Sequence, residues 1–191
     1  MLGVGEKFPA FELTGVLPGD APEALKPCDS RDYAGKWRVL FFWPKDFTFV
    51  CPTELVGFGE LQSEFQKRNA ELLGASVDSE YVHLAWRRER AELRDLPFPM
   101  LSDVKRELSG ALGILDPKAG VAQRATYIVD PEGVIRFIYV TDLSVGRSPA
   151  EVLRVLDALQ TGELCPVNWK AGEQTLRKPA PAVETASVTV N

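Results

Sequence analysis

The stretch from residue 37 to residue 68, WRVLFFWPKDFTFVCPTELVGFGELQSEFQKR, decides the fold. Its first seven residues, 37–43, form an apolar, aromatic and β-branched run that ends at Pro44, as is typical of a buried strand. Residues 53–68 then predict a helix, because their apolar positions recur every three or four residues with polar side chains between them. Those apolar positions are Leu55, Phe58, Leu61 and Phe65. The stretch therefore predicts a strand followed directly by an amphipathic helix.

Further along the chain the same alternation continues. Residues 72–77 predict a second strand, and Asp78-Ser79 can cap a helix over 80–94. The inward face of that helix is expected to carry Val82, Trp86 and Leu93. A short helix over 103–112 has an acidic first turn and stops at Gly113. The strand at 37–43, the helix at 53–68 and the strand at 72–77 thus predict a βαβ unit.

The second half of the chain no longer alternates single strands with helices. Residues 125–129 and 134–140 are β-rich and are separated by the turn composition Asp-Pro-Glu-Gly at 130–133, which predicts a hairpin. Ser148-Pro149-Ala150-Glu151 is a capping box that opens a helix ending near Gln160, before Gly162. The element order favours an α/β fold with a central mixed sheet flanked by helices, of which the thioredoxin-like arrangement is one example.

Two segments fall outside this core. Pro18 to Pro27 is rich in proline and polar residues and is expected to be a loop insert. The tail from Lys178 to Asn191 lacks periodicity and is expected to be mobile.

Composition excludes several classes of protein. The chain has 191 residues, 45% hydrophobic and 26% charged, which fits one globular domain with a tail. Its formal net charge of -5 has the wrong sign for binding nucleic acid or an anionic membrane. The longest strongly apolar run, residues 39–43, is far shorter than the 18 or so residues that span a bilayer. No secretory signal is evident at the start, so a cytoplasmic protein is expected.

The cysteines are the best candidates for chemistry. Three cysteines, Cys28, Cys51 and Cys165, are too few for a disulfide framework and indicate reduced or reactive thiols. Cys51 lies where the loop after the first buried strand enters the helix, and there free backbone N–H groups and the helix dipole stabilise a thiolate. From position alone, Cys51 can equally be a small buried hydrophobic residue.

A family resemblance separates these two interpretations. Residues 44–54, PKDFTFVCPTE, resemble the active-site motif of the peroxiredoxins. Residues 162–169, GELCPVNW, resemble the resolving-cysteine motif of typical 2-Cys peroxiredoxins, specifically the alkyl hydroperoxide reductase C (AhpC) group. Three shorter segments also match in order and approximate spacing: 98–103, 120–124 and 145–148. The resemblance covers about Val4 to Thr175 and implies a thioredoxin-like fold with N-terminal and C-terminal extensions.

The resemblance assigns roles around Cys51. Cys51 would be the peroxidatic nucleophile, which attacks the peroxide and becomes a sulfenic acid. Arg124 and Thr48 would stabilise the charge that develops as the O–O bond breaks, and Pro44 would shield the sulfur from water. Taken singly, Thr48 could be a helix cap, Pro44 a strand terminator and Arg124 a surface charge, so the choice of Arg124 rests wholly on the resemblance.

Glu54 and Arg147 match residues that orient the first arginine in the family. Arg147 taken alone would be interpreted as a solvated surface charge. These two residues are therefore expected to support the site through Arg124.

Cys165 would be the resolving cysteine. In the resembling family this cysteine condenses with the sulfenic acid of another subunit, which here implies an intersubunit Cys51–Cys165 disulfide and local unwinding at Cys51 in every turnover. The resemblance further implies a peroxiredoxin domain over 1–162 with a C-terminal extension over 163–191. It implies homodimers that assemble into decamers, a reductant that is a thioredoxin-like dithiol protein or a dedicated flavoprotein, and no metal, haem or flavin cofactor.

Cys28 and His83 are not expected to take part in catalysis. Cys28 is expected to be exposed and non-catalytic, and His83 structural or solvated. A zinc site built from Cys28, Cys51, His83 and Cys165 would lack any close cysteine pair. The chain has neither the Gly-Gly-Leu-Gly insertion nor the C-terminal Tyr-Phe helix of many eukaryotic members, which by resemblance implies resistance to sulfinic acid formation.

The predicted function is thus a thiol peroxidase that reduces hydrogen peroxide, organic hydroperoxides and peroxynitrite in antioxidant defence. A disulfide oxidoreductase or isomerase of the same fold would require a Cys-x-x-Cys motif, and Cys51 has no second cysteine at that spacing. A holdase-like scaffold built as a ring is the alternative from a different class.

Overall fold

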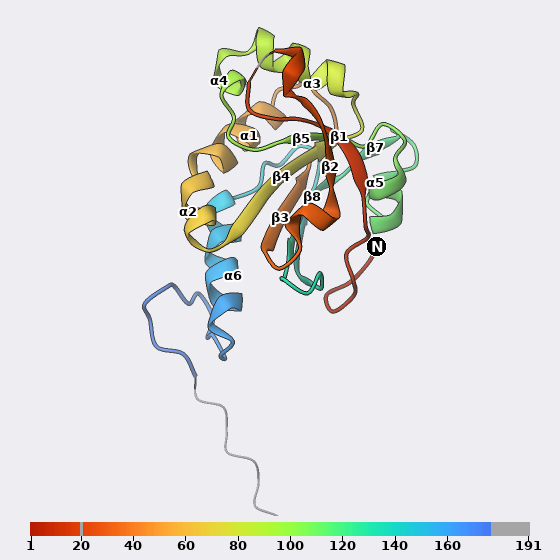
Figure 1. Cartoon of the computed structure of the whole chain (residues 1–191). Helices are drawn as coiled ribbons and strands as arrows, with labels where there is room; N and C mark the ends of the chain where they lie inside the picture. The colour runs from red at the N-terminus through yellow and green to blue at the C-terminus, as the bar shows by residue number, and fades with distance from the viewer. Residues whose placement is uncertain (20, 177–191) are drawn as a thin grey trace, which may run out of the picture.

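A mixed β-sheet forms the centre of the molecule in the computed structural model, which describes residues 1–19 and 21–176 (Figure 1). Within these residues, seven strands pair in the order β2-β1-β5-β4-β3-β8-β9. The strands are β1 (Glu12–Val16), β2 (Leu25–Asp29), β3 (Trp37–Phe42), β4 (Ala70–Ser76), β5 (Met100–Ser102), β8 (Arg124–Val129) and β9 (Ile135–Thr141). The central strands β3, β4 and β5 run parallel, whereas β8 and β9 and the β1–β2 pair are antiparallel. This is the mixed sheet that the element order predicts, in the thioredoxin-like arrangement that the family resemblance implies.

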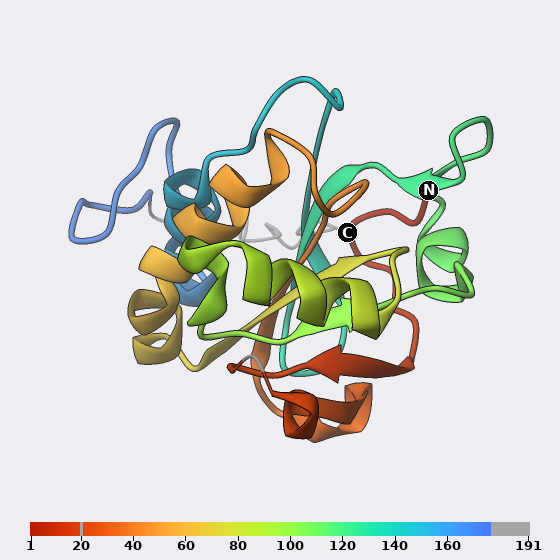
Figure 2. The same cartoon turned by 90° about the horizontal axis from the view of Figure 1, so that it is seen from above.

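Helices cover both faces of this sheet. The helices are α1 (Cys51–Glu60), α2 (Gln62–Lys67), α3 (Glu80–Glu89), α4 (Ala91–Arg94), α5 (Glu107–Leu112) and α6 (Pro149–Thr161). Two short 3-10 turns, η1 (Pro22–Ala24) and η2 (Ser30–Tyr33), flank β2, and a two-stranded ribbon pairs β6 (Leu115–Asp116) with β7 (Val121–Ala122). Figures 1 and 2 show α1, α2 and α6 together on one side of the sheet and α5 on the other.

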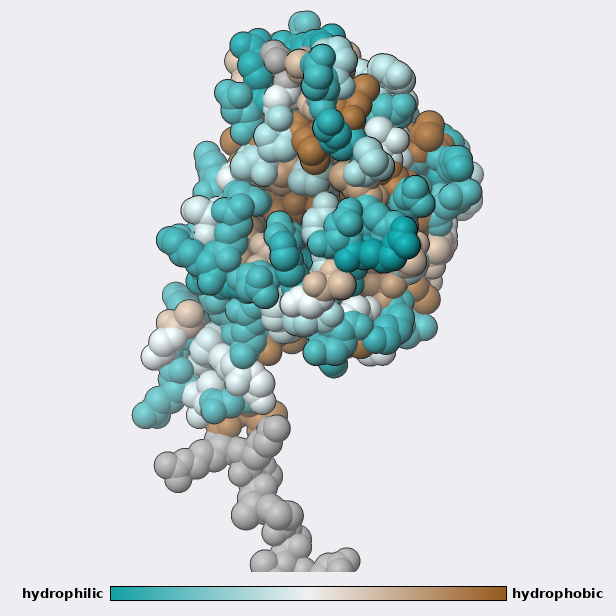
Figure 3. All heavy atoms as spheres, in the orientation of Figure 1, coloured by the Kyte–Doolittle hydropathy of each residue, from teal (hydrophilic) through white to brown (hydrophobic). Residues whose placement is uncertain are grey.

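Alternation along β3 divides the core into two layers. Val39 and Phe41 face α1, α2, α3 and α6, whereas Leu40 and Phe42 face α5 and the N-terminal segment. All four side chains are fully buried, which explains why the strand is a continuous apolar run. Polar side chains cover most of the face in Figure 3, where hydrophobic residues appear in small areas.

Most of the predicted elements are confirmed, including the β8–β9 hairpin and the caps at Ser79 and Ser148. Gly113 and Gly162 end α5 and α6 with φ of 71° and 65°, a backbone conformation that favours glycine. The capping box at Ser148 is half formed, because the Ser148 hydroxyl accepts from the Glu151 N–H while the Glu151 carboxylate pairs with Arg154 instead.

Three helix boundaries differ from the sequence prediction. The helix expected over 53–68 begins at Cys51 and breaks at Leu61, whose ψ of 3° ends α1 before α2 starts. The helix expected over 80–94 is interrupted by extended backbone at Arg90. The segment from Asp103 is a turn before α5, where the Asp103 carboxylate accepts the N–H groups of residues 108 and 109. Apolar periodicity continues through the breaks at Leu61 and Arg90, so it could not reveal them. Asp103, which predicts an acidic first helical turn, instead bonds the start of α5 from outside the helix.

The proline-rich insert is partly a strand. Residues 25–29 form β2, which pairs with β1 at the edge of the sheet, where Pro27 is tolerated because edge positions need no N–H donor. Cys28 lies in this strand and is 4% exposed, so the expectation that Cys28 is exposed is wrong. The tail expected to be mobile, 178–191, lies outside the described residues.

Candidate active site

Cys51 is the first residue of α1, and its side chain is fully buried. Val50 caps the helix without a side-chain hydrogen bond, and Pro52 occupies the first turn, where its missing N–H costs nothing. The Thr53 hydroxyl donates to the Val50 carbonyl at 2.6 Å. The chain therefore presents a cysteine sulfur at the positive end of a helix.

Two polar side chains contact this sulfur. The Thr48 hydroxyl lies 2.9 Å from Cys51 Sγ and also 2.9 Å from the Lys45 carbonyl oxygen, and its single proton can serve one of them at a time. The guanidinium of Arg124 approaches Cys51 Sγ to 3.4 Å through one terminal nitrogen. A hydroxyl and a fixed cation thus converge on one buried sulfur.

Glu54, one helical turn after Cys51, holds this arginine. Its Oε2 accepts a hydrogen bond of 2.7 Å from Arg124, and the same carboxylate accepts from the backbone N–H, Nε and a terminal nitrogen of Arg147 at 2.8–2.9 Å. Arg124 and Glu54 are almost fully buried, and the Arg147 side chain is wholly buried. One carboxylate between two guanidinium groups leaves one net positive charge facing the sulfur.

Sheet pairing explains how residues so far apart in sequence meet. Arg124 is the first residue of β8, whose antiparallel register beside β3 brings its start next to the end of β3 and the loop leading to Cys51. Arg124 Nε also donates to the Leu143 carbonyl at 2.7 Å, and Arg147 donates to the Ala125 carbonyl at 2.8 Å. Figure 2 shows the segment that leads into α6 passing close to the start of α1.

Charge and burial compete at Glu54. Burial acts to raise the pKa of this carboxyl, but the hydrogen bonds and charge of Arg147, together with the charge of Arg124, outweigh it and hold the pKa below its ordinary value. Glu54 is therefore ionised at neutral pH. The Arg147 guanidinium also lies 5.6 Å from the centre of the Phe41 ring, a cation–π contact that fixes it further.

A pocket of about 340 Å³ opens beside this cluster. Its wall is mostly apolar, with Thr48 and Arg124 among the polar side chains that line it. The lining residues are Pro44, Lys45, Thr48, Phe49, Val50, Ala119, Val121, Arg124 and Leu143. Ala119 and Val121 line the pocket from the β6–β7 ribbon, and local sequence patterns do not place this ribbon beside Cys51.

The structure therefore places Pro44, Thr48, Cys51, Glu54, Arg124 and Arg147 in one cluster. Cys165 lies elsewhere. Cys165 comes after the C-terminal end of α6. The Cys51 site lies near the other end, because Val50 and Glu54 adjoin Gly146, just before α6 begins. Since α6 has 13 residues, the two cysteines of one chain lie at opposite ends of a helix about 20 Å long.

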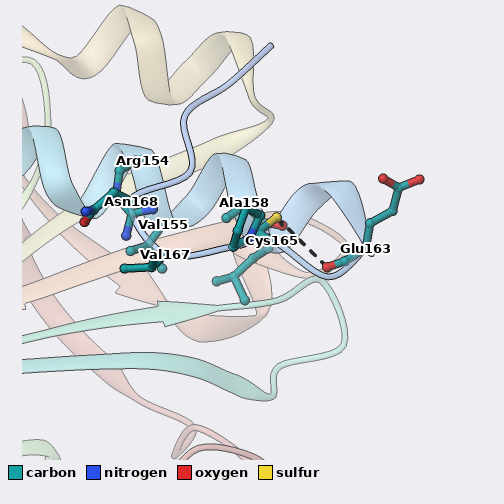
Figure 4. Close-up of a pocket in the computed structure, with 9 residues that line it drawn as sticks. Arg154, Val155, Ala158, Glu163, Cys165, Val167 and Asn168 are labelled. Carbon is teal, nitrogen blue, oxygen red and sulfur yellow. Dashed lines mark hydrogen bonds between the residues drawn. The ribbon is translucent and has the colours of Figure 1, made fainter. Parts of the chain in front are cut away.

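Cys165 is half-buried against the end of α6. Its Sγ lies 3.5 Å from the Thr161 hydroxyl and 3.7 Å from the Ala158 carbonyl oxygen. It lines a second pocket, of about 550 Å³, between α6 and the residues that follow it (Figure 4). All three cysteines of the chain are free thiols.

His83 is buried rather than solvated. Its ring nitrogens lie 2.6 Å from Asp46 Oδ2 and 3.2 Å from the Leu101 carbonyl oxygen, and Trp43 Nε1 donates to the other oxygen of Asp46 at 2.7 Å. This network anchors the loop that precedes Cys51, so the structural interpretation of His83 holds. No signal in the sequence pointed to Asp46.

Among residues 1–19 and 21–176, no three His, Cys, Asp and Glu side chains gather in an arrangement that could hold a metal ion. In the same part of the chain, no helix is both long and apolar enough to cross a membrane.

Comparison with known proteins gives consistent results. The AhpC/TSA family model matches residues 4–138, and a model described as the C-terminal domain of 1-Cys peroxiredoxin matches residues 158–188. Alkyl hydroperoxide reductase C of Mycolicibacterium smegmatis is 54% identical over 184 residues, which cover 92% of this chain and 94% of that protein. Peroxiredoxin-2 of Bos taurus is 45% identical over 181 residues, covering 91% and 89%.

Solved structures agree with the sequence matches. Mycobacterium tuberculosis AhpC superposes with a TM-score of 0.82 at 52% identity, covering 89% of this chain and 99% of that one. The reduced 2-Cys peroxiredoxin of Plasmodium vivax gives a TM-score of 0.85 at 33% identity, covering 92% and 93%.

Proposed function

Because this chain belongs to the AhpC/TSA family and is a peroxiredoxin, a peroxidase that reduces peroxides with a thiol, we propose that Cys51 is its peroxidatic cysteine. The observation that carries this assignment is the contact of Thr48 and Arg124 with the buried Cys51 sulfur at the start of α1. An electropositive, preorganised setting of this type favours a reactive thiolate.

In the first step the Cys51 thiolate attacks the terminal, hydrogen-bearing oxygen of a hydroperoxide. An S–O bond forms as the O–O bond breaks, and the leaving alkoxide or hydroxide takes up a proton from solvent. The products are a Cys51 sulfenic acid and an alcohol or water. Arg124 and Thr48 are the donors that stabilise the charge developing on the leaving oxygen, and Pro44 limits the access of water to the sulfur. Glu54 and Arg147 act through Arg124, which they hold in place.

In the second step the thiol of Cys165 attacks the sulfenic sulfur, a Cys51–Cys165 disulfide forms, and water leaves. We assign Cys165 to a second subunit, since Cys165 packs against the last turns of α6 whereas the Cys51 site adjoins the residues just before that helix, and a disulfide needs Cα atoms within about 7 Å. The first turn of α1 must unwind, because the Cys51 sulfur is fully buried.

The reductant and the assembly belong to the same proposal. A thioredoxin-like dithiol protein or a dedicated flavoprotein would return the disulfide to two thiols, and homodimers would assemble into decamers in the cytoplasm. The separate family match of residues 158–188 supports the division into a domain over 1–162 and an extension over 163–191. Hydrogen peroxide and organic hydroperoxides are the proposed substrates.

A non-reducing gel tests this function. Reduced protein receives one equivalent of hydrogen peroxide, as wild type and as serine variants at Cys28, Cys51 and Cys165. A covalent dimer that requires Cys51 and Cys165 but not Cys28 is the expected result. A dimer that survives Cys165→Ser, or one that requires Cys28, would contradict the assignment of the resolving step.

A further inference from the structure

The segment after α6 folds back along that helix. Gly162 turns the chain, after which Cys165 Sγ lies 3.7 Å from the Ala158 carbonyl oxygen, and the Trp169 carbonyl accepts a hydrogen bond of 2.9 Å from Arg154. Arg154 and Ala158 are one helical turn apart, and Cys165 and Trp169 are likewise four residues apart. The segment therefore retraces one turn of α6 in the opposite direction, as Figure 4 shows for Cys165 over Ala158 and Asn168 beside Arg154.

Residues 166–173 form a turn that is closed on itself. Trp169 Nε1 donates to the Glu173 carbonyl at 3.0 Å, the Lys170 N–H donates to the Glu173 carboxylate at 2.9 Å, and the Trp169 N–H donates to the Pro166 carbonyl at 3.2 Å. Trp169 itself is 4% exposed. The turn thus behaves as one unit that is attached to α6 at Trp169.

Arg154 makes that attachment. Its guanidinium donates to the Trp169 carbonyl. Within the described residues, this is the one N–H···O hydrogen bond between residues 163–176 and any residue that precedes Thr161. The Glu151 carboxylate orients the guanidinium with two bonds of 2.6 and 2.7 Å, which leaves the remaining terminal nitrogen directed at the Trp169 carbonyl. Arg154 and Cys165 line the same pocket, which places the guanidinium near this thiol.

We propose that Arg154 is a positioning residue for disulfide formation, which holds the segment after α6 in place so that Cys165 meets the Cys51 sulfenic acid of a second subunit. The proposal rests on the proposed function. A tethered segment samples fewer positions, so the effective concentration of its thiol at the partner's site is higher than that of a free segment. Arg154 is kept apart from the reacting atoms of the first step, because its guanidinium bonds Glu151 and Trp169, whereas Thr48 and Arg124 contact the Cys51 sulfur.

The test separates the two chemical steps in the full-length reduced protein. Stopped-flow tryptophan fluorescence after mixing with hydrogen peroxide follows sulfenic acid formation and then disulfide formation. Arg154→Gln should leave the first rate constant within about twofold of wild type and lower the second about tenfold, the size of effect expected from a hydrogen bond to a charged group. Arg154→Lys retains a cationic donor for the Trp169 carbonyl and should recover most of the second rate constant.

The matched control is Arg68→Gln. Arg68 also pairs with a carboxylate of α6, Asp157, but it joins that helix to α2 and not to the following segment. Both rate constants should be unchanged in this variant. Glu151→Gln, which loosens the arginine without removing it, should slow the second step by a smaller factor and serves if Arg154→Gln fails to fold.

Mass spectrometry gives an independent readout. The sulfenic acid persists longer in Arg154→Gln, so the fraction of Cys51 converted to sulfinic acid at a fixed peroxide excess should rise by about the factor by which the second step slows.

Three results would overturn the proposal: a second rate constant equal to wild type in Arg154→Gln, an equal fall in both rate constants, or the same slowing in Arg68→Gln. Cys165→Ser distinguishes this failure from that of the proposed function. If Cys165→Ser still forms the intersubunit disulfide, the proposed function fails together with the positioning role. If it abolishes the disulfide while Arg154→Gln forms it at the wild-type rate, the positioning role alone fails.

Discussion

Replacing Glu54 with glutamine should damage both the stability and the reactivity of this protein. The carboxylate accepts four hydrogen bonds, one from Arg124 and three from Arg147, and it neutralises one of the two buried charges. A glutamine of the same shape has one acceptor oxygen, and its NH₂ group would face guanidinium donors on the other side. In either orientation, two of the four donors lose their acceptor.

The magnitude follows from this loss. Removing one partner of a buried ion pair typically costs about 3–5 kcal/mol, and because glutamine retains the volume and half of the bonds we expect about 3 kcal/mol. For a domain of this size, that lowers the melting temperature by roughly 10 °C. Arg124 also loses the contact that holds it beside Cys51, so the rate constant for sulfenic acid formation should fall about 100-fold.

The pH dependence provides a further check. Because the folded pKa of Glu54 lies below its ordinary value, its contribution to stability is complete above the pKa of the unfolded chain and is lost as the pH falls through the folded pKa. The difference in unfolding free energy between wild type and Glu54→Gln should therefore be largest near pH 7 and shrink as the pH falls below about 4.

Denaturant unfolding at several pH values, together with stopped-flow oxidation at pH 7, measures these effects. Glu60→Gln is the control, because Glu60 lies on the same helix and is exposed. A Glu54→Gln protein within 1 kcal/mol of wild type at pH 7, or a stability difference that does not change with pH, would refute the reasoning from a buried bridging carboxylate.

Three other predictions follow from individual sites. A Cβ at Gly74 would lie 2.8 Å from the buried Trp43 ring, so Gly74→Ala should lower the free energy of unfolding by about 1–3 kcal/mol. A Cβ at Gly110 on α5 would meet open space, so Gly110→Ala should raise that free energy by up to about 1 kcal/mol. Denaturant midpoints measure both changes. Burial raises the pKa of the Cys28 thiol, so iodoacetamide should label Cys28 more slowly than the half-buried Cys165 in native protein at pH 7, as peptide mapping would show. Thr48→Val should slow sulfenic acid formation about 100-fold and Thr48→Ser much less, as measured by stopped flow.

Local patterns predicted the strands and helices well, because each follows from the side chains of one short segment. The run at 37–43 and the turn at 130–133 needed no information from elsewhere in the chain. The breaks at Leu61 and Arg90 were missed because backbone dihedrals change there while the apolar periodicity continues. The strand at 25–29 was missed because its pairing partner, β1, supplies the hydrogen bonds that its proline-rich sequence does not suggest.

The site was predicted unevenly for the same reason. The position of Cys51 before a helix allowed a reactive thiol or a buried hydrophobic residue, and only the family resemblance favoured the thiol. Arg124 and Arg147 likewise could be chosen among the arginines only through that resemblance. Their placement depends on the pairing of β8 with β3 and on the approach to α6, which local patterns do not encode. The exposure of Cys28 was predicted wrongly, because the burial of a side chain on an edge strand depends on which other segments pack over that strand.

The carboxylate of Glu54 joins three parts of the chain that are synthesised far apart in time. It binds partners 70 and 93 residues downstream, so this arrangement cannot exist while the ribosome is still adding the segment before α6. Contacts of such long sequence separation close late in folding. An unfinished or partly folded chain therefore carries a cysteine without its arginine, and full reactivity toward peroxide should appear only when the whole domain has been made and has folded.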